Sequence, residues 1–252
     1  MALSALGANR GQAQDFTEAF QPSLHYGFRS YPLGTSLDIR LAQALKLWGE
    51  PQEGPLYGFL RPSVEWSTAV TYNALSAQVE FFPLSFFGLR SGLQAVDNRS
   101  DYTAYDCNLH LCKGRFHKDF AEIQLALAYA QFFVLAQFRQ ESLNWTGPES
   151  AQRFVDPEHA LSMEPKGEAV FRQSLILGVN LSPSLRVMLL DRKSMIKADR
   201  GIQAKTQLAL ISRQRGPWTL TSGLGSFVGE LNKKNISFIF GASYSPNWGG
   251  EL

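Results

Sequence analysis

Residues 171–190 read FRQSLILGVNLSPSLRVMLL, and their hydrophobicity repeats with a period of two. Over residues 171–181 one face is almost entirely apolar, whereas the other face carries Arg172 and Ser174. A period of two fits a strand and not a helix. A Ser-Pro-Ser turn follows at residues 182–184, and the alternation then resumes. The stretch therefore predicts a hairpin of two long strands.

The length of these strands distinguishes between two kinds of sheet. The first strand spans roughly 13 residues, more than twice the ~5–6 residues usual in soluble sheets. A tilted strand that crosses a bilayer needs roughly 9–11 residues. The hairpin thus favours a membrane barrel over a soluble β-sandwich or a lipocalin-like barrel.

Composition excludes a helical membrane protein. The chain has 252 residues, 44% of them hydrophobic, and a mean hydropathy of −0.15. No run of 18 or more apolar residues is present, which a spanning helix needs; the nearest, residues 121–138, is broken by Glu122 and three glutamines. A barrel with one polar and one apolar face keeps such an average hydropathy. The net charge of +2 gives no indication of a nucleic-acid partner.

Two cysteines, Cys107 and Cys112, lie in a polar stretch. We expect a local disulfide in an exported loop; the alternative is two free thiols, and a metal site would need more ligands than this segment offers. The first residues show no secretion signal. Either the protein is cytosolic or the chain is a mature form with an added methionine; we expect the second, because the strand pattern requires a membrane.

Strand-like segments follow one another along most of the chain. We assign residues 1–22 to a flexible or partly helical extension and residues 23–252 to the barrel. About twelve segments alternate, at 23–30, 37–48, 60–70, 75–81, 87–94, 122–129, 132–140, 171–181, 185–192, 202–210, 218–225 and 236–244. Long loops are expected at 96–115 and 143–166. Residues 117–142 lack a turn signal, so two strands and a single helix both stay open there.

An even number of strands with alternating short and long connections predicts an all-β fold. The expected form is a transmembrane antiparallel up-and-down β-barrel with short periplasmic turns and longer extracellular loops. In the segment 202–210 we place Leu208 and Leu210 on the apolar outer face and Lys205 on the inner face.

Residues 23–248 resemble the bacterial outer-membrane β-barrel family, in its porin-like branch. The resemblance rests on the strand pattern and on aromatic residues near strand ends, as in interfacial girdles. The predicted girdle contains Trp48, Trp66, Tyr129, Trp218, Tyr244 and Trp248; Phe81, Phe87, Phe138 and Phe171 also lie near strand ends. Residues 236–244 look like the terminal strand that the assembly machinery recognises, although residues 249–252 extend past Trp248.

The resemblance implies residence in the outer membrane of a Gram-negative bacterium. Membrane lipid and lipopolysaccharide then surround the barrel, and small hydrophilic solutes pass through it. We expect a homo-oligomer of undetermined number, with no cofactor, no metal and no nucleic acid.

The predicted inner face carries the charged residues. The pore-lining residues are predicted to be Arg40, Lys46, Arg61, Glu65, Glu80, Arg90, Arg172, Arg186, Arg192 and Lys205. With Arg139, Asp38 and Glu122 on the same face, nine basic residues oppose four acidic ones. This favours a passive diffusion channel that leans weakly toward anions. The alternative is that these charges pair across the lumen and fill it, which leaves a structural or oligomerising barrel.

A barrel enzyme of lipase or protease type is a second alternative. The contexts of His25, His110, His117 and His159 do not match the His-x-Ser arrangement of barrel phospholipases. His117 and Asp119 form the one nearby pair, which we interpret as a solvated loop pair. No phosphate loop, metal-ligand spacing or nucleophile elbow is present. The sequence therefore predicts no enzyme activity.

Overall fold

A computed structural model describes residues 20–31, 33–50, 54–101, 106–147, 153–156, 158, 161–165, 167–197, 203–230 and 234–246. Its strands are β1 (Phe20–Ser30), β2 (Leu33–Gln43), β3 (Leu45–Trp48), β4 (Gly58–Thr68), β5 (Tyr72–Leu84), β6 (Phe87–Asn98), β7 (Gly114–Tyr129), β8 (Phe132–Trp145), β9 (Phe154–Asp156), β10 (Leu161–Met163), β11 (Glu168–Ser182), β12 (Leu185–Ile196), β13 (Gln203–Arg215), β14 (Trp218–Val228) and β15 (Lys234–Tyr244). The predicted N-terminal extension falls on residues outside these ranges, except that 20–22 belong to β1.

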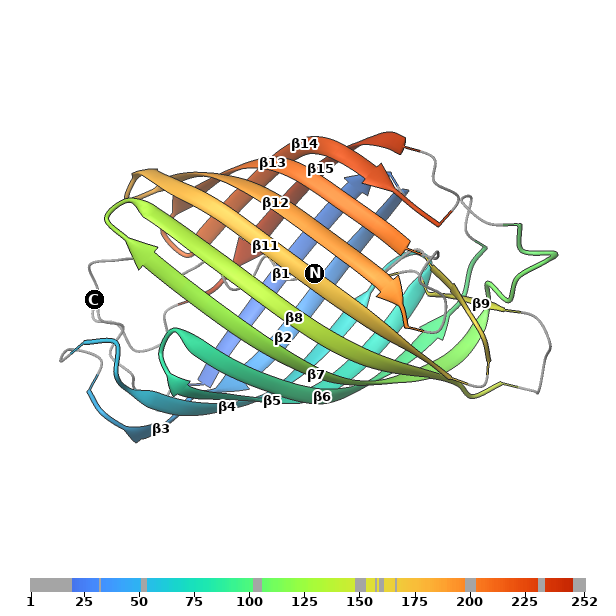
Figure 1. Ribbon diagram of the computed structural model, residues 1–252, viewed down its shortest axis with the longest axis horizontal. Coiled ribbons are helices and arrows are strands. Elements are labelled where there is room, and N and C mark those ends of the chain that lie inside the picture. Colours follow the sequence, from blue (N-terminus) through green and yellow to red (C-terminus); the bar gives the residue numbers. More distant parts are fainter. Residues whose placement is uncertain are drawn as a thin grey trace.

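Twelve of these strands close into a ring (Figure 1). Each strand of the wall pairs antiparallel with its neighbours, and the ring closes where β1 pairs with β15 and β2 pairs with β4. The short strand β3 continues β2 past Ala44 and pairs with the start of β4. The predicted fold class, a twelve-stranded antiparallel barrel, is confirmed. Because every wall strand has two neighbours, the ring leaves no open edge.

The two ends of the barrel differ in their connections. At one end, the turn end, residues 85–86, 130–131, 183–184 and 216–217 link strands directly. At the other, the loop end, lie the long connections 99–113 and 146–167. Strand β1 begins and β15 ends at the turn end. Short turns on the periplasmic side and longer loops outside are the arrangement of outer-membrane barrels.

The uncertain region 117–142 forms two strands, β7 and β8, and not a helix. Their turn contains Ala130, whose φ of 48° lies in the left-handed region. Gly or Asn usually occupies that conformation, because a Cβ atom makes it costly. The turn therefore lacks the residues by which a turn is recognised in a sequence.

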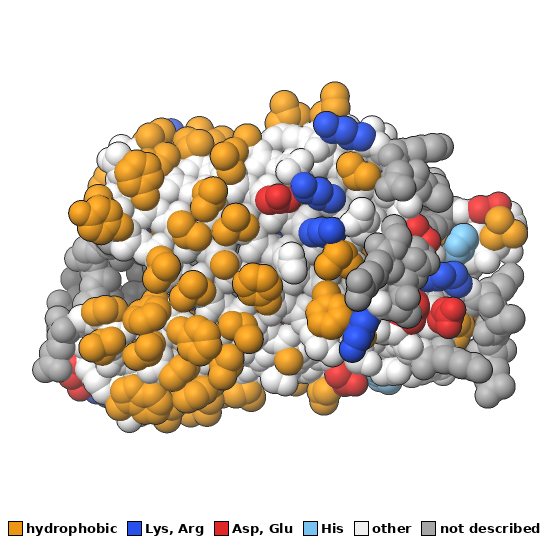
Figure 2. All heavy atoms as spheres, in the orientation of Figure 1, with side chains coloured by type: hydrophobic (Ala, Val, Ile, Leu, Met, Phe, Trp, Pro, Cys, Tyr) orange, Lys and Arg blue, Asp and Glu red, His pale blue; other side chains and the backbone are white. Residues whose placement is uncertain are grey.

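The outer wall of the barrel is apolar toward the turn end. Side chains that alternate outward from the strands include Leu75, Leu93, Ile123, Leu127, Leu177, Leu189, Leu220 and Leu224, all well exposed. Figure 2 shows such side chains covering the wall away from the loop end. Leaving one side chain of this kind in water costs about 1.5–3 kcal/mol, so the wall as a whole requires hydrocarbon. In the described part of the chain, no helix has the length and hydropathy to span a bilayer.

The outer wall makes a depth-dependent prediction. Leu177 lies in the middle of the apolar stretch of β11, and Leu181 lies at its turn end; both point outward. We expect Leu177→Arg to destabilise the barrel by about 2–4 kcal/mol and Leu181→Arg by about 0–1 kcal/mol, because the cost of a cation falls from the midplane to the interface. Unfolding by denaturant in lipid vesicles measures both values. Equal losses would show that the apolar wall does not face a bilayer.

Candidate pore lining and mouth hairpin

Eight of the ten predicted pore-lining residues alternate onto the inner face of the wall. These are Arg40, Arg61, Glu65, Glu80, Arg90, Arg172, Arg186 and Arg192. Lys46 lies in β3 beyond the last β2–β4 pair, and its Nζ atom is 2.5 Å from Glu50 Oε1 at the turn end. Both side chains there are well exposed, so Lys46 belongs to the rim.

The prediction for Lys205 was wrong, because the phase of β13 is the reverse of the one expected. Leu208 and Leu210 point inward and are 5% and 2% exposed. Lys205 points outward, with its Nζ atom 3.7 Å from Asp191 Oδ2. Strand β13 carries apolar residues on both faces, since Ile211 points outward. Hydrophobicity could therefore not fix its phase, and a slip of one residue inverts every side chain.

Leu208 and Leu210 belong to an apolar cluster inside the wall. Its buried members are Leu135, Ile176, Met188, Leu190, Leu208 and Leu210, from β8, β11, β12 and β13. The inner wall thus contains an apolar patch, whereas inward charges lie on β2, β4–β8, β11 and β12. The assumption of a uniformly polar interior did not anticipate this patch.

The charged sector is built on one register row that crosses six strands. Arg61 of β4 is paired with Glu80, Glu80 with Arg90, Arg90 with Glu122, Glu122 with Arg139 and Arg139 with Arg172. The signs alternate along this row except between Arg139 and Arg172. Opposite charges at directly opposed positions stabilise neighbouring strands, and like charges destabilise them.

Glu80 is the acceptor at one end of the row. Its carboxylate is 2.5 Å from Arg61 Nε and 3.0 Å from Arg40 Nη2, and it also contacts Arg90. The Glu80 side chain is 1% exposed. Three cations around one buried carboxylate offset part of the cost of removing it from water.

The row continues through two further carboxylates. Glu122 lies 3.5 Å from Arg90 and 3.8 Å from Arg139. Glu141 of β8 lies 2.5 Å from Arg139 Nε and 3.6 Å from Arg172 Nη2. Arg139 and Arg172 are register partners with no acid between them in the row. Glu141, which contacts both, supplies the negative charge that they share.

The hairpin β9–β10 folds back to the mouth of the barrel at the loop end (Figure 1). Lys118 of β7 donates to both carboxylate oxygens of Asp156, each at 3.1 Å, and to Glu158 Oε2 at 2.9 Å. Arg172 Nη1 donates to Glu158 Oε1 at 2.6 Å. The charged row of the wall therefore continues into the hairpin.

Apolar contacts hold the hairpin in the same place. Phe154, Leu161 and Met163 are fully buried in a cluster with inward side chains of the wall, among them Ala74, Val96, Phe116, Leu143, Val170, Ile196, Ala204 and Phe227. Ser162 donates its backbone N–H and its hydroxyl to Glu230 at 2.8 and 2.7 Å. The hairpin is thus attached to most sides of the mouth.

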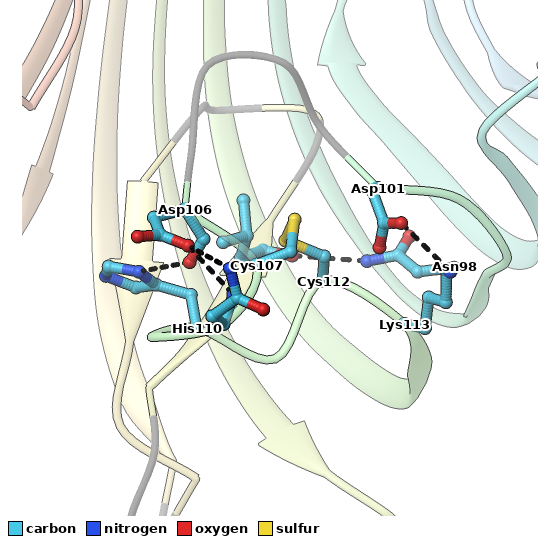
Figure 3. Close-up of a disulfide and its surroundings, with 9 residues drawn as sticks. Asn98, Asp101, Asp106, Cys107, His110, Cys112 and Lys113 are labelled. Atoms are coloured by element: carbon cyan, nitrogen blue, oxygen red, sulfur yellow. Dashed lines mark hydrogen bonds and ion pairs between the residues drawn. A yellow bond between two sulfur atoms is a disulfide. The ribbon is translucent and has the colours of Figure 1, made fainter.

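Cys107 and Cys112 form a disulfide in the loop between β6 and β7 (Figure 3). Leu111 in this loop makes a parallel bridge to Phe154: Leu111 N–H donates to Arg153 O at 2.8 Å, and Val155 N–H donates to Leu111 O at 3.1 Å. The cross-linked loop therefore lies against the hairpin and supports it from the loop end.

A small cavity of about 20 Å³ remains between the hairpin and the wall. Its charged lining consists of Arg29, Arg172 and Arg192 with Glu158, and Ser194 and Thr206 add hydroxyls. Arg192 Nε donates to Ser174 Oγ at 2.9 Å. This space is enough for about one water molecule, so the hairpin turn at Glu158 packs closely against the wall here.

The sequence missed five charged residues of this site. One is Arg29, which has the inward parity of His25 on β1. Lys118 and Glu141 have the same parity as the predicted inner residues Glu122 and Arg139, so extending each strand would have found them. Asp156 and Glu158 lie in a long loop, where no periodicity indicates an inward direction. With these acids, the inner charge is closer to balance than the predicted nine to four.

Histidines take positions that the sequence motifs did not indicate. His25 points inward, and its Nδ1 atom lies 2.8 Å from Ser243 Oγ on the neighbouring strand β15. Its Nε2 atom is buried and has no hydrogen-bond partner among the described residues. His117 and Asp119 lie on the exposed outer face of β7 and not in a loop. His159 falls outside the described residues.

The predicted girdle divides between the two ends. Trp48, Tyr129, Trp218 and Tyr244 lie at the turn end, and the rings of Trp218 and Tyr244 are 4.8 Å apart. Trp66 lies toward the loop end of β4, 44% exposed. Trp248 falls outside the described residues. The aromatic positions at the turn end are those of an interfacial ring.

The hairpin contacts lead to a prediction about Lys118. Lys118→Met leaves Asp156 and Glu141 buried without their ammonium partner, and breaking a buried pair costs about 3–5 kcal/mol. We therefore expect the hairpin to leave the mouth. Val155 is buried in the native chain, so the thiol of a Val155→Cys reporter should be protected there and should become reactive to a maleimide in the Lys118→Met background.

Lys113→Met is the matched control for this experiment. Lys113 is exposed and pairs with Asp101 at 3.0 Å on the disulfide loop, so this change should leave the reporter thiol protected. Because Cys107 and Cys112 are bonded to each other, the reporter is the reactive thiol. A reporter that stays protected in the Lys118→Met variant would show that the ionic contacts do not hold the hairpin.

Comparisons with solved structures find outer-membrane proteins at low sequence identity. A NanC porin aligns with a TM-score of 0.49 and 13% identity over 88% of this chain and 98% of that chain. A KdgM porin gives 0.46 and 9% over 89% and 98%. Outer membrane phospholipase A from Escherichia coli gives 0.40 and 10% over 91% and 93%. No family model and no curated protein matches the chain.

These likenesses transfer no function, because porins and a phospholipase appear together at similar scores. The location follows from the chain's own architecture: an even-numbered closed ring, an apolar outer wall, and short turns at one end with long loops at the other. This protein is a transmembrane β-barrel of the bacterial outer membrane.

Proposed function

We propose that the barrel is a channel for passive diffusion of small hydrophilic solutes, with a weak preference for anions. The observation that carries the proposal is the charged inner wall, which runs unbroken from β2 to β11 inside an apolar outer wall. A lumen with fixed charges and hydrogen-bonding groups offers small polar solutes partners in exchange for water. A barrel that served only as a membrane anchor would not need this lining.

The anion preference is supported by the charges where the hairpin meets the wall. Three arginines and one glutamate line the cavity between the hairpin and the wall. Basic groups at a constriction lower the barrier for negative solutes and raise it for positive ones. The preference is weak because the acids Glu80, Glu122 and Glu141 compensate most of the arginines elsewhere.

The hairpin β9–β10 then acts as the restriction at the outer mouth. Its charged contacts lie on the side of the lumen where the basic residues gather, and its apolar contacts fix its depth. Solutes pass the mouth when the hairpin is displaced.

A second candidate function is a structural barrel with an occluded lumen, as a homo-oligomer in the membrane. The same hairpin favours it, because residues of the wall and of the hairpin bury one another at the mouth. Conductance distinguishes the two functions.

The test uses purified protein in planar bilayers with a KCl gradient. We expect discrete conductance with a reversal potential displaced toward anion permeation. Arg192→Gln should move the reversal potential toward cations, because it removes a charge from the constriction. Arg213→Gln is the control: Arg213 is on the outer face of β13 at the turn end, so this change should leave the selectivity unaltered.

Other results separate the candidates. Conductance that appears only when residues 153–165 are replaced by a short Gly-Ser linker would support the occluded barrel. An equal effect of Arg192→Gln and Arg213→Gln would refute the role of the constriction. A silent bilayer with both the native chain and the linker variant would refute the channel.

A further inference from the structure

Three lysines form a row on the outer wall at the loop end. Lys193 of β12 is the register partner of Lys205 of β13, Lys205 is the partner of Val228, and Val228 is the partner of Lys234 of β15. All four side chains lie on the outer face. Since neighbouring strands are about 4.8 Å apart, the three ammonium groups can converge on one ligand. We call Lys193, Lys205 and Lys234 the lysine row.

The lysine row is short of acidic partners. Lys205 has Asp191 at 3.7 Å, and among the described residues neither Lys193 nor Lys234 has an acidic partner. Lys193 and Lys205 face each other directly, an arrangement of like charges that destabilises a pair of strands. The row therefore lacks compensation that an external anion would supply.

Other exposed cations at the loop end are compensated. Asp97 contacts Arg99 at 3.0 Å and Arg115 at 3.6 Å, and Lys113 contacts Asp101 at 3.0 Å. Among the described residues of the loop end, the uncompensated positive charge thus lies on the wall formed by β12 to β15. Lys197 extends it toward the loop, with its Nζ atom 5.9 Å from the ring of Phe171.

The apolar outer wall lies four to six residues from the lysine row toward the turn end. On the same strands, Leu189, Ile211, Leu224 and Phe238 point outward and are exposed. Figure 2 shows basic side chains along the border between this apolar wall and the loop end. An amphipathic ligand at this border would place its polar headgroup against the ammonium groups and its apolar chain against the exposed leucine, isoleucine and phenylalanine side chains.

We propose that the lysine row binds the phosphorylated headgroup of an outer-leaflet glycolipid, whose acyl chains lie against the apolar wall of β12 to β15. The loop end faces the outer leaflet, so the row lies at the depth of its headgroups. Each lysine near an anionic surface adds about 1 kcal/mol of attraction. The continuity with the lipid-facing wall distinguishes a lipid from an acidic protein, which would need no hydrocarbon below its charges.

Native mass spectrometry of the detergent-purified chain tests the proposal with bisphosphorylated lipid A as the probe. Lys193→Gln/Lys205→Gln should weaken lipid A binding by about thirtyfold. The control Lys113→Gln/Arg115→Gln removes the same charge from the other side of the loop end and should leave binding within about twofold. Heat-modifiable gel mobility establishes that both variants keep the folded barrel.

Three comparisons separate the sources of an anion. Phosphatidylethanolamine and dephosphorylated lipid A should bind the native chain weakly. Their binding to the two double variants should be equally weak. Inorganic phosphate at millimolar concentration should not displace lipid A; full displacement would show a phosphate site without a lipid and overturn the proposal. Equal weakening by the two double variants, or none, would also overturn it, as would an acidic protein that occupies the row in place of lipid.

Discussion

The bilayer interior offers the backbone no hydrogen-bond partner, and this constraint underlies the rest of the structure. A strand in hydrocarbon must pair on both edges, so twelve strands of 11–16 residues pair into a closed ring. Once the ring is closed, alternate side chains must face either lipid or the lumen. The apolar outer wall and the charged inner sector are two consequences of this single geometry.

A second constraint is that charged side chains inside the lumen need partners of opposite charge. Arginines that point into a confined lumen need carboxylates at hydrogen-bond distance, because isolated charges there are costly. The row from Arg61 to Arg172 supplies them by register, with one acid for each neighbouring base until Arg139 meets Arg172. At that point Glu141 and the hairpin acid Glu158 complete the compensation. The hairpin is thus part of the charge balance of the wall.

Alternation alone predicted most of the wall. It placed eight of the ten named lumen residues on the inner face, and it gave the strand number, since lipid on one side enforces a period of two. It could not fix β13, where both Leu210 and Ile211 are apolar and either phase satisfies the pattern. It also could not reveal the β7–β8 turn, because Ala130 adopts a conformation that its residue type does not indicate.

The candidate site was less predictable than the fold, because its contacts are long-range. Asp156 and Glu158 come from a loop without periodicity, and His25 meets Ser243 across 218 positions of sequence. The charge count of the lumen therefore shifted once the loop was placed, although each wall residue in that count, apart from Lys46 and Lys205, points inward.

The side chains against which the hairpin packs also constrain the order of assembly. Phe154, Leu161 and Met163 pack with side chains from strands as distant in sequence as Val96 of β6 and Phe227 of β14. This packing surface does not exist until the late strands have joined the early ones. During biogenesis the mouth therefore stays wide while the wall is still being added to, and it narrows as one of the final maturation steps of the nascent chain.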